Sequence, residues 1–187
     1  VLPSLPARGV PSAAPVSEAA VDAILGQWVH AVLEQWTLLP QRLRTEARLG
    51  QVLRSSQARV PSPAHTPDWA ALQPRAMSLL SHIAQSPALQ RWLAVEPWDW
   101  AGNEVALADG LGTMRLDRLV SELTPDGSRT WWVIDYKLHH DPMANPAYLA
   151  QMKRYVDAVQ AAQPGERVGG GFITSAGKWV PWGAPGA

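Results

Sequence analysis

Three short segments in the second half of the chain constrain the fold most, because each is rich in β-forming residues and bounded by turn residues. They cover residues 103–108, 113–121 and 130–138. Asp109-Gly110 separates the first two segments, and Pro125-Asp126-Gly127 separates the last two. Spacers this short join strands that run in opposite directions. The pattern therefore predicts a meander of three antiparallel strands.

The first half of the chain has helical periodicity instead. From Ser17, a residue type suited to cap a helix, apolar residues recur every three or four positions until Pro40. Residues 41–59 hold five arginines among leucines and predict a second helix with a cationic side. Residues 60–67 predict a loop, and residues 68–93 predict one or two short helices broken by a proline.

The end of the chain returns to a helix and then to strands. Residues 147–162 have helical spacing, and the glycine run 169–171 leads into a strand at residues 172–174, with residues 178–182 as a further candidate strand. The predicted order is thus helices, three strands, a helix and a strand. This order predicts an α/β (α+β) fold with a central mixed β-sheet flanked by helices.

Composition excludes several classes of protein. Of the 187 residues, 47% are hydrophobic, which is enough for one domain with a sizeable core. Sixteen basic residues balance sixteen acidic ones, so no global positive field attracts nucleic acid. The absence of cysteine excludes disulfides, thiolate zinc sites and an iron–sulfur cluster. No apolar run is long enough to cross a membrane and no signal peptide is apparent, so we expect a cytoplasmic protein with no membrane partner.

Residues 133–137 carry the strongest functional signal. They read Val-Ile-Asp-Tyr-Lys, and because side chains alternate along a strand, Asp135 and Lys137 should share one face while Ile134 and Tyr136 share the other. A carboxylate and an ammonium on an apolar strand are costly unless they serve each other, a metal ion or a substrate. An ordinary salt bridge is one explanation, and a functional site is the other.

A second acid is expected beside this pair. Asp117 lies in the preceding predicted strand, which should pair with the strand of Asp135 through the turn at 125–127. Two acids side by side without an arginine repel each other, and a divalent cation is the usual remedy. Oxygen ligands favour Mg²⁺ or Mn²⁺ over zinc. Lys137 can then orient an attacking water or stabilise charge on a phosphoryl oxygen.

Together with other motifs, these residues resemble a known family. Asp117, then the Asp-Tyr-Lys of residues 135–137, then Gln-Met-Lys-Arg-Tyr at 151–155 are similar to the RecB-type branch of the PD-(D/E)xK nuclease superfamily. That branch also has a Gly-x-x-x-His stretch in an N-terminal helix, and this chain has Gly-Gln-Trp-Val-His at 26–30. Glu104 matches the acidic strand that commonly precedes the Asp-bearing one.

The resemblance also implies a domain organisation. It runs from about residue 17 to 182, with residues 41–97 matching only as a variable helical insertion. We therefore expect one nuclease domain over residues 17–187 with a restriction-endonuclease-like core. Residues 1–16 are proline-rich and begin with Val1 rather than Met, as in a linker that leads in from a longer protein.

A role for each matched residue follows from the resemblance. His30, Asp117 and Asp135 would bind Mg²⁺ or Mn²⁺, with the backbone carbonyl of Tyr136 as a further ligand. Asp117 and Asp135 would be catalytic together with Lys137. A histidine packed within its helix, without a metal, is the alternative for His30.

Three further residues would support the site. Gln151 and Tyr155 lie four residues apart on one helix, hence on one side of it, and would brace the site or touch DNA. Glu104 would act as a supporting acid or contact the metal through water. Core packing is the alternative for Tyr155, and a surface position is the alternative for Glu104.

Two histidines follow the Asp-Tyr-Lys strand directly. Consecutive residues at a strand end point to opposite sides, so His139 and His140 should not face one ion together. With Asp141, they predict a polar loop near the cleft, and a contact with DNA is the alternative for this loop.

By the same resemblance, the chain would be a Mg²⁺-dependent exonuclease domain of the kind found at the C-terminus of UvrD/RecB/AddA-like helicase-nuclease subunits. It would hydrolyse DNA from single-stranded ends in double-strand break repair and recombination. Its partners would be DNA, an N-terminal helicase domain of the same chain and further subunits. Two alternatives stay open: a stand-alone RecB-like exonuclease of CRISPR-associated or phage type, and a non-catalytic module that keeps the fold and binds DNA or a partner.

Overall fold

The chain changes from helices to strands near residue 100. The computed structural model describes residues 17–61 and 67–183, so the predicted linker at 1–16 and part of the loop predicted at 60–67 lie outside the described residues. The elements in chain order are α1 (Glu18–Trp36), α2 (Glu46–Ser56), α3 (Trp69–Gln85), α4 (Gln90–Leu93), β1 (Trp100–Asp109), β2 (Gly112–Leu123), β3 (Arg129–Lys137), α5 (Pro146–Ala162), β4 (Arg167–Thr174) and β5 (Trp179–Trp182). Short 3₁₀ turns cover Gln41–Leu43, Gln57–Arg59, Pro87–Leu89 and Pro142–Ala144.

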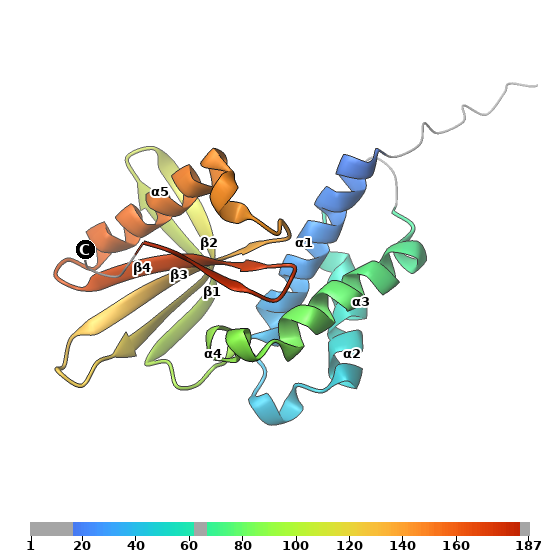
Figure 1. The fold of residues 1–187 in the computed structure, drawn as a ribbon, viewed down its shortest axis with the longest axis horizontal. Coiled ribbons are helices and arrows are strands. Elements are labelled where there is room, and N and C mark those ends of the chain that lie inside the picture. Colours follow the sequence, from blue (N-terminus) through green and yellow to red (C-terminus); the bar gives the residue numbers. More distant parts are fainter. Residues whose placement is uncertain (1–16, 62–66, 184–187) are drawn as a thin grey trace, which may run out of the picture.

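The five strands form one mixed sheet in the order β1-β2-β3-β4-β5 (Figure 1). β1, β2 and β3 pair antiparallel, which confirms the predicted meander. β3 and β4 pair parallel, and α5 provides the crossover that a parallel pair requires. β5 returns antiparallel to β4. The observed α+β architecture confirms the predicted fold class.

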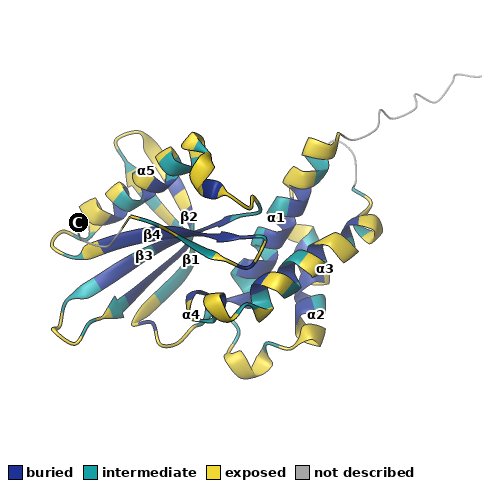
Figure 2. Cartoon of the chain, in the orientation of Figure 1, coloured by how far each residue is buried: buried dark blue, intermediate teal, exposed yellow. Residues whose placement is uncertain are grey.

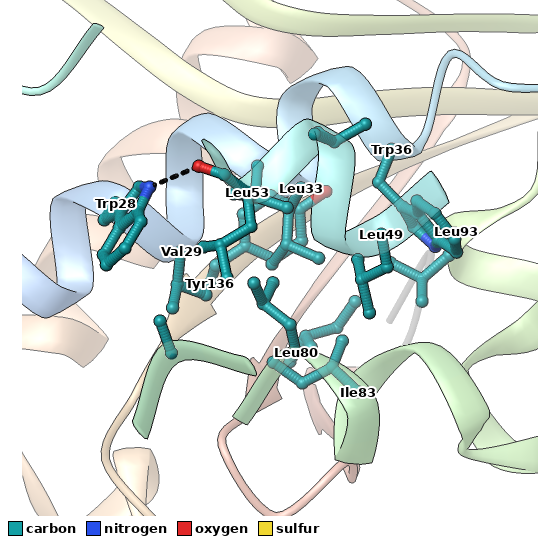
Figure 3. Close-up of a cluster of buried hydrophobic side chains, with 14 of the residues drawn as sticks. Trp28, Val29, Leu33, Trp36, Leu49, Leu53, Leu80, Ile83, Leu93 and Tyr136 are labelled. Atoms are coloured by element: carbon teal, nitrogen blue, oxygen red, sulfur yellow. Dashed lines mark hydrogen bonds between the residues drawn. The ribbon is translucent and has the colours of Figure 1, made fainter. Parts of the chain in front are cut away.

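Each face of the sheet has its own hydrophobic core. Figure 2 shows buried residues on the strands and on the helices that pack against them. On one face, Ile134 and Tyr136 of β3 pack into the cluster formed by α1, α2, α3 and α4. Figure 3 shows Tyr136 in this cluster, where the indole of Trp28 donates to the Leu53 carbonyl over 2.9 Å. On the other face, Val133 packs in a cluster with α5. The predicted alternation along β3 is therefore confirmed.

Two local predictions are wrong. Residues 41–59 do not form one helix: after the first 3₁₀ turn, the Thr45 hydroxyl caps α2 by accepting the N–H of Arg48 over 3.2 Å. Arg44 lies at this break because its guanidinium donates to the carbonyls of Leu39, Thr37 and Leu93.

The glycine run lies inside β4 instead of leading into it. A Cβ on Gly171 would be 2.5 Å from the Trp179 ring, and one on Gly170 would be 2.6 Å from the Met152 sulfur. These glycines therefore let an indole and α5 approach the two faces of the strand closely.

Among the helices of the described residues, none has the length and apolar content needed to cross a membrane.

Candidate active site

The predicted acids meet where the pairing of β2 and β3 ends. The ladder between these strands stops at the Arg118–Ile134 pair, and Asp117 and Asp135 are the next residues in that register. Beyond the ladder, a carboxylate oxygen of Asp117 accepts the N–H of Tyr136 over 2.8 Å. The end of the pairing therefore places the Asp117 carboxylate between the two strands.

The side-chain alternation of β1 and β2 also breaks at this level. On β1, Asn103 donates to the Glu34 carbonyl of α1 over 2.7 Å, whereas Val105 packs in the core on the α5 face. Two residues apart, they should share a face. Glu104 lies between them with a φ of 52°, an uncommon backbone for a residue other than glycine.

On β2, the same break separates Leu116 in the α5-face core from Arg118, which donates to the carbonyls of Trp92 and Ala94. The register places Glu104 opposite Asp117, because the pairs on either side of them are aligned. Glu104, Asp117 and Asp135 therefore occupy equivalent positions on three neighbouring strands. The alternation is broken at Glu104 and Asp117 and regular at Asp135, so two of the three positions in this row depart from regular strand patterning.

His30 reaches this row from α1. Its Nε2 lies 2.7 Å from the Tyr136 carbonyl oxygen, and its Nδ1 lies 3.6 Å from the nearer Asp117 oxygen. Gly26 lies one helical turn before His30. A Cβ at this position would be 3.8 Å from the Leu138 side chain, so α1 lies close to the residue that follows β3. The Gly-x-x-x-His spacing thus brings the imidazole to the acids, as predicted.

Burial favours the protonated forms of the Asp117 and Asp135 carboxyl groups. It raises the pKa of Asp117 to about 6, despite the hydrogen bond from the Tyr136 N–H. Burial, and secondarily the negative charge of Asp117, raises the pKa of Asp135 to about 7, although Lys137 lowers it. Burial also lowers the pKa of His30, so this imidazole is neutral near pH 7.

Lys137 alone does not balance the charge of both Asp117 and Asp135. Lys137 Nζ lies 2.9 Å from Oδ2 of Asp135, yet that buried oxygen has no contact with hydrogen-bond geometry. If Nε2 of neutral His30 donates to the Tyr136 carbonyl, Nδ1 presents a lone pair towards the Asp117 carboxylate. Two acceptors facing each other require a proton or a cation nearby.

Lys137 is held by α5. Its ammonium donates to the Gln151 side-chain carbonyl over 2.9 Å, and the Gln151 amide donates to the Tyr155 hydroxyl over 2.7 Å. The ammonium also lies 4.7 Å from the centroid of the Tyr148 ring. Gln151 and Tyr155 thus brace the lysine, one of the two roles that the resemblance implied, and Tyr155 packs in the core as well.

Glu104 differs from the other two acids. Its carboxylate pairs with Arg115 of β2 over 3.1 Å, and its side chain is 36% exposed. It contributes negative charge that raises the pKa of Asp117, but in the described structure its strongest contact is this arginine.

The donor groups suit a hard divalent cation. Two carboxylates, a backbone carbonyl and a neutral imidazole are ligands that Mg²⁺ and Mn²⁺ accept. In the described part of the chain, no three His, Asp or Glu side chains stand ready as a metal cage. The His30–Tyr136 hydrogen bond uses Nε2 of the imidazole and leaves Nδ1 on the side of Asp117.

Several residues near the site were not found from the sequence. Tyr148 precedes Gln151 by three residues, and this helical spacing was the available signal. Arg115 belongs to no motif, and it meets Glu104 as a diagonal neighbour in the β1–β2 register, in which it pairs with Ala106. The predicted polar loop at His139 and His140 is confirmed, because both follow β3 outside the strand. Their rings stack at 4.9 Å between centroids and so do not point to opposite sides. Outside the strand, alternation does not apply.

Comparison with known proteins places the chain in a family. A comparison with curated proteins finds no match. A family model described as the PD-(D/E)XK nuclease superfamily matches residues 7–179. Members of this superfamily are typically nucleases. Since the match covers most of the chain and includes the row of acids and the lysine described above, the protein belongs to the PD-(D/E)XK nuclease superfamily.

Proposed function

We propose that this protein is a deoxyribonuclease that uses Mg²⁺ or Mn²⁺ to hydrolyse phosphodiester bonds. The observation that carries the proposal is the meeting of His30, Asp117, Asp135 and Lys137 where the β2–β3 pairing ends. The raised pKa values of the two carboxylates and the unbonded oxygen of Asp135 support a cation between them. The family match supports nuclease chemistry.

His30, Asp117, Asp135 and the Tyr136 carbonyl would hold the metal ion. When bound, the ion supplies Lewis-acid polarisation of the scissile phosphate and lowers the pKa of a water molecule. Lys137 has two restraints, the Asp135 carboxylate and the Gln151 carbonyl, which aim its ammonium at one place. There it can orient the attacking water or stabilise the negative charge that develops on the phosphate oxygens.

Asp117 has a second role that needs no metal. By accepting the Tyr136 N–H, its carboxylate fixes the backbone whose carbonyl faces His30. Loss of this hydrogen bond would release the end of β3, which carries Lys137. We therefore expect Asp117 to position the site as well as to bind the ion.

Cleavage of linear single-stranded DNA with Mg²⁺ tests this function. Wild type should degrade the DNA, and Asp135→Asn should lose at least ~10²-fold in rate, since oriented charges of this kind contribute on that order. Asp157→Asn is the matched control, because Asp157 is an exposed acid of α5 paired with Lys153. Equal cleavage rates for wild type and Asp135→Asn would refute the role of this site. No cleavage by either protein would refute the proposal and favour a non-catalytic binding module.

The finer assignment is also a proposal. The order of motifs along residues 17–187, with the helical insertion 41–97, supports an exonuclease domain of the RecB type. Such a domain would accept single-stranded ends from a helicase of the same chain during double-strand break repair. The alternative is a stand-alone exonuclease with the same site. Exonuclease action predicts that linear single-stranded DNA is degraded and that its circular form is not.

A further inference from the structure

A hollow lies directly beside the candidate catalytic lysine. It has a volume of about 360 Å³ and is enclosed by α1, α3, the segment after β3 and the start of α5. Figure 1 shows the connection from β3 to α5 turning towards α1 at this place. Tyr148 belongs both to the wall of the hollow and to the surroundings of Lys137, whose ammonium is 4.7 Å from the centre of the Tyr148 ring. A single side chain, the Tyr148 ring, therefore borders both the hollow and the Lys137 ammonium.

The walls of the hollow are apolar and aromatic. Leu79 and Leu138 line it together with the rings of Tyr148 and His139, which meet edge to face with centroids 6.4 Å apart. The exposed His139 ring makes one hydrogen bond to the Asp141 backbone through Nδ1, which either donates to the carbonyl oxygen over 3.0 Å or accepts the N–H over 3.2 Å, depending on its tautomer. Aromatic side chains held in this way are the surfaces on which unpaired bases stack.

The rim of the hollow provides both kinds of hydrogen-bonding group. Arg75 of α3 donates to Asp22 of α1 over 2.9 Å, and both side chains are more than half exposed. An exposed ion pair contributes only about 0–1 kcal/mol, so a ligand can replace it at small cost. The edge of a nucleobase carries donors and acceptors together, which an arginine and an aspartate match.

We infer that this hollow binds an unpaired nucleobase of the DNA strand that flanks the scissile phosphate. The inference rests on the proposed function and gives it a substrate class. The volume of the hollow lies in the range of about 300–1,000 Å³ typical of small-ligand pockets. A paired base cannot enter without leaving its stack and its partner, which costs a few kcal/mol. The hollow therefore selects single-stranded over double-stranded DNA.

Equilibrium binding without metal tests the hollow. The probe is a fluorescently labelled single-stranded DNA oligonucleotide in EDTA, compared with a set in which one nucleotide at a time is abasic. We expect one abasic position to weaken binding to wild type about 5- to 20-fold, as loss of one stacked base does. His139→Ala should weaken binding of the intact probe similarly. This variant should then bind the intact probe and the probe with that abasic position with equal affinity. Trp100→Ala, which removes an exposed ring outside the hollow, should preserve the difference.

Thermal unfolding of each variant shows whether it is folded, and Arg75→Gln provides a second, exposed variant that should also weaken binding. Equal affinities for intact and abasic probes, or a His139→Ala protein that still distinguishes them, would overturn the inference. Cleavage with Mg²⁺ is measured on the same probes. Cleavage that does not depend on any single base would refute base binding in the hollow and would still support the nuclease function. Base-dependent binding without cleavage would support base binding in the hollow and refute the nuclease function. If the folded wild type neither binds nor cleaves, both are refuted.

Discussion

Neutralising one acid of the site should stabilise the metal-free protein at alkaline pH. Asp135 is 3% exposed, and its pKa is raised from 3.8 to about 7. The folded protein keeps this proton where the unfolded chain has released it, so wild type loses stability as pH rises from about 4 to about 7. A difference of about 3 pKa units at 1.36 kcal/mol each gives about 4 kcal/mol. Asp135→Asn has no such proton and avoids this loss.

The ion pair with Lys137 is already part of this balance, because Lys137 lowers the raised pKa of Asp135. We therefore expect Asp135→Asn to exceed wild type by about 4 kcal/mol at pH 8. Near pH 4, where wild-type Asp135 is protonated, the gain should disappear. Urea denaturation in EDTA at several pH values measures this difference, with Asp157→Asn as the exposed control. If Asp135→Asn is less stable than wild type at pH 8, or its advantage does not vary with pH, the reasoning about the buried acid is refuted.

Further substitutions test the sheet and the brace of the lysine. Arg118→Met should cost about 3–5 kcal/mol in urea denaturation, since this buried guanidinium donates to two carbonyls of the α4 region and to Asn103; an unchanged midpoint would contradict this. Gly171→Ala should cost about 1–3 kcal/mol because its Cβ would overlap an indole, whereas Gly110→Ala, with nothing within 4 Å, should change little; equal effects would refute the close packing. Gln151→Leu should lower kcat about 10- to 100-fold with little change in KM, because the ammonium of Lys137, the proposed catalytic lysine, loses a restraint; an unaltered kcat would show that the brace is dispensable.

The sequence predicts regular elements well where side-chain periodicity is strong. The capped helix α1, the β-meander and α5 all lie where spacing placed them, because one face of each is buried. The break at Arg44 could not be predicted, since it depends in part on the Leu93 carbonyl contributed by α4. The place of the glycines in β4 depends likewise on an indole from β5, which only the folded sheet brings near.

The residues of the candidate site could be proposed from the sequence, but their geometry could not. Motif spacing singles out His30, Asp117, Asp135 and Lys137, and the fold brings them together where the β2–β3 pairing ends. The left-handed backbone of Glu104 breaks the strand alternation on which sequence reasoning relies. Sequence alone also gives no indication of the hollow beside Tyr148, since four separate segments form it.

The most direct measurement is the rate of Mg²⁺-dependent cleavage of end-labelled single-stranded DNA by wild type, Lys137→Met and Lys153→Met. The two lysines differ in place: Lys137 lies at the row of acids, and Lys153 is an exposed residue of α5 paired with Asp157. A metal-dependent nuclease centre at the end of β3 predicts that Lys137→Met loses cleavage while Lys153→Met cleaves like wild type. Cleavage by Lys137→Met at the wild-type rate would show that the catalytic centre is not there.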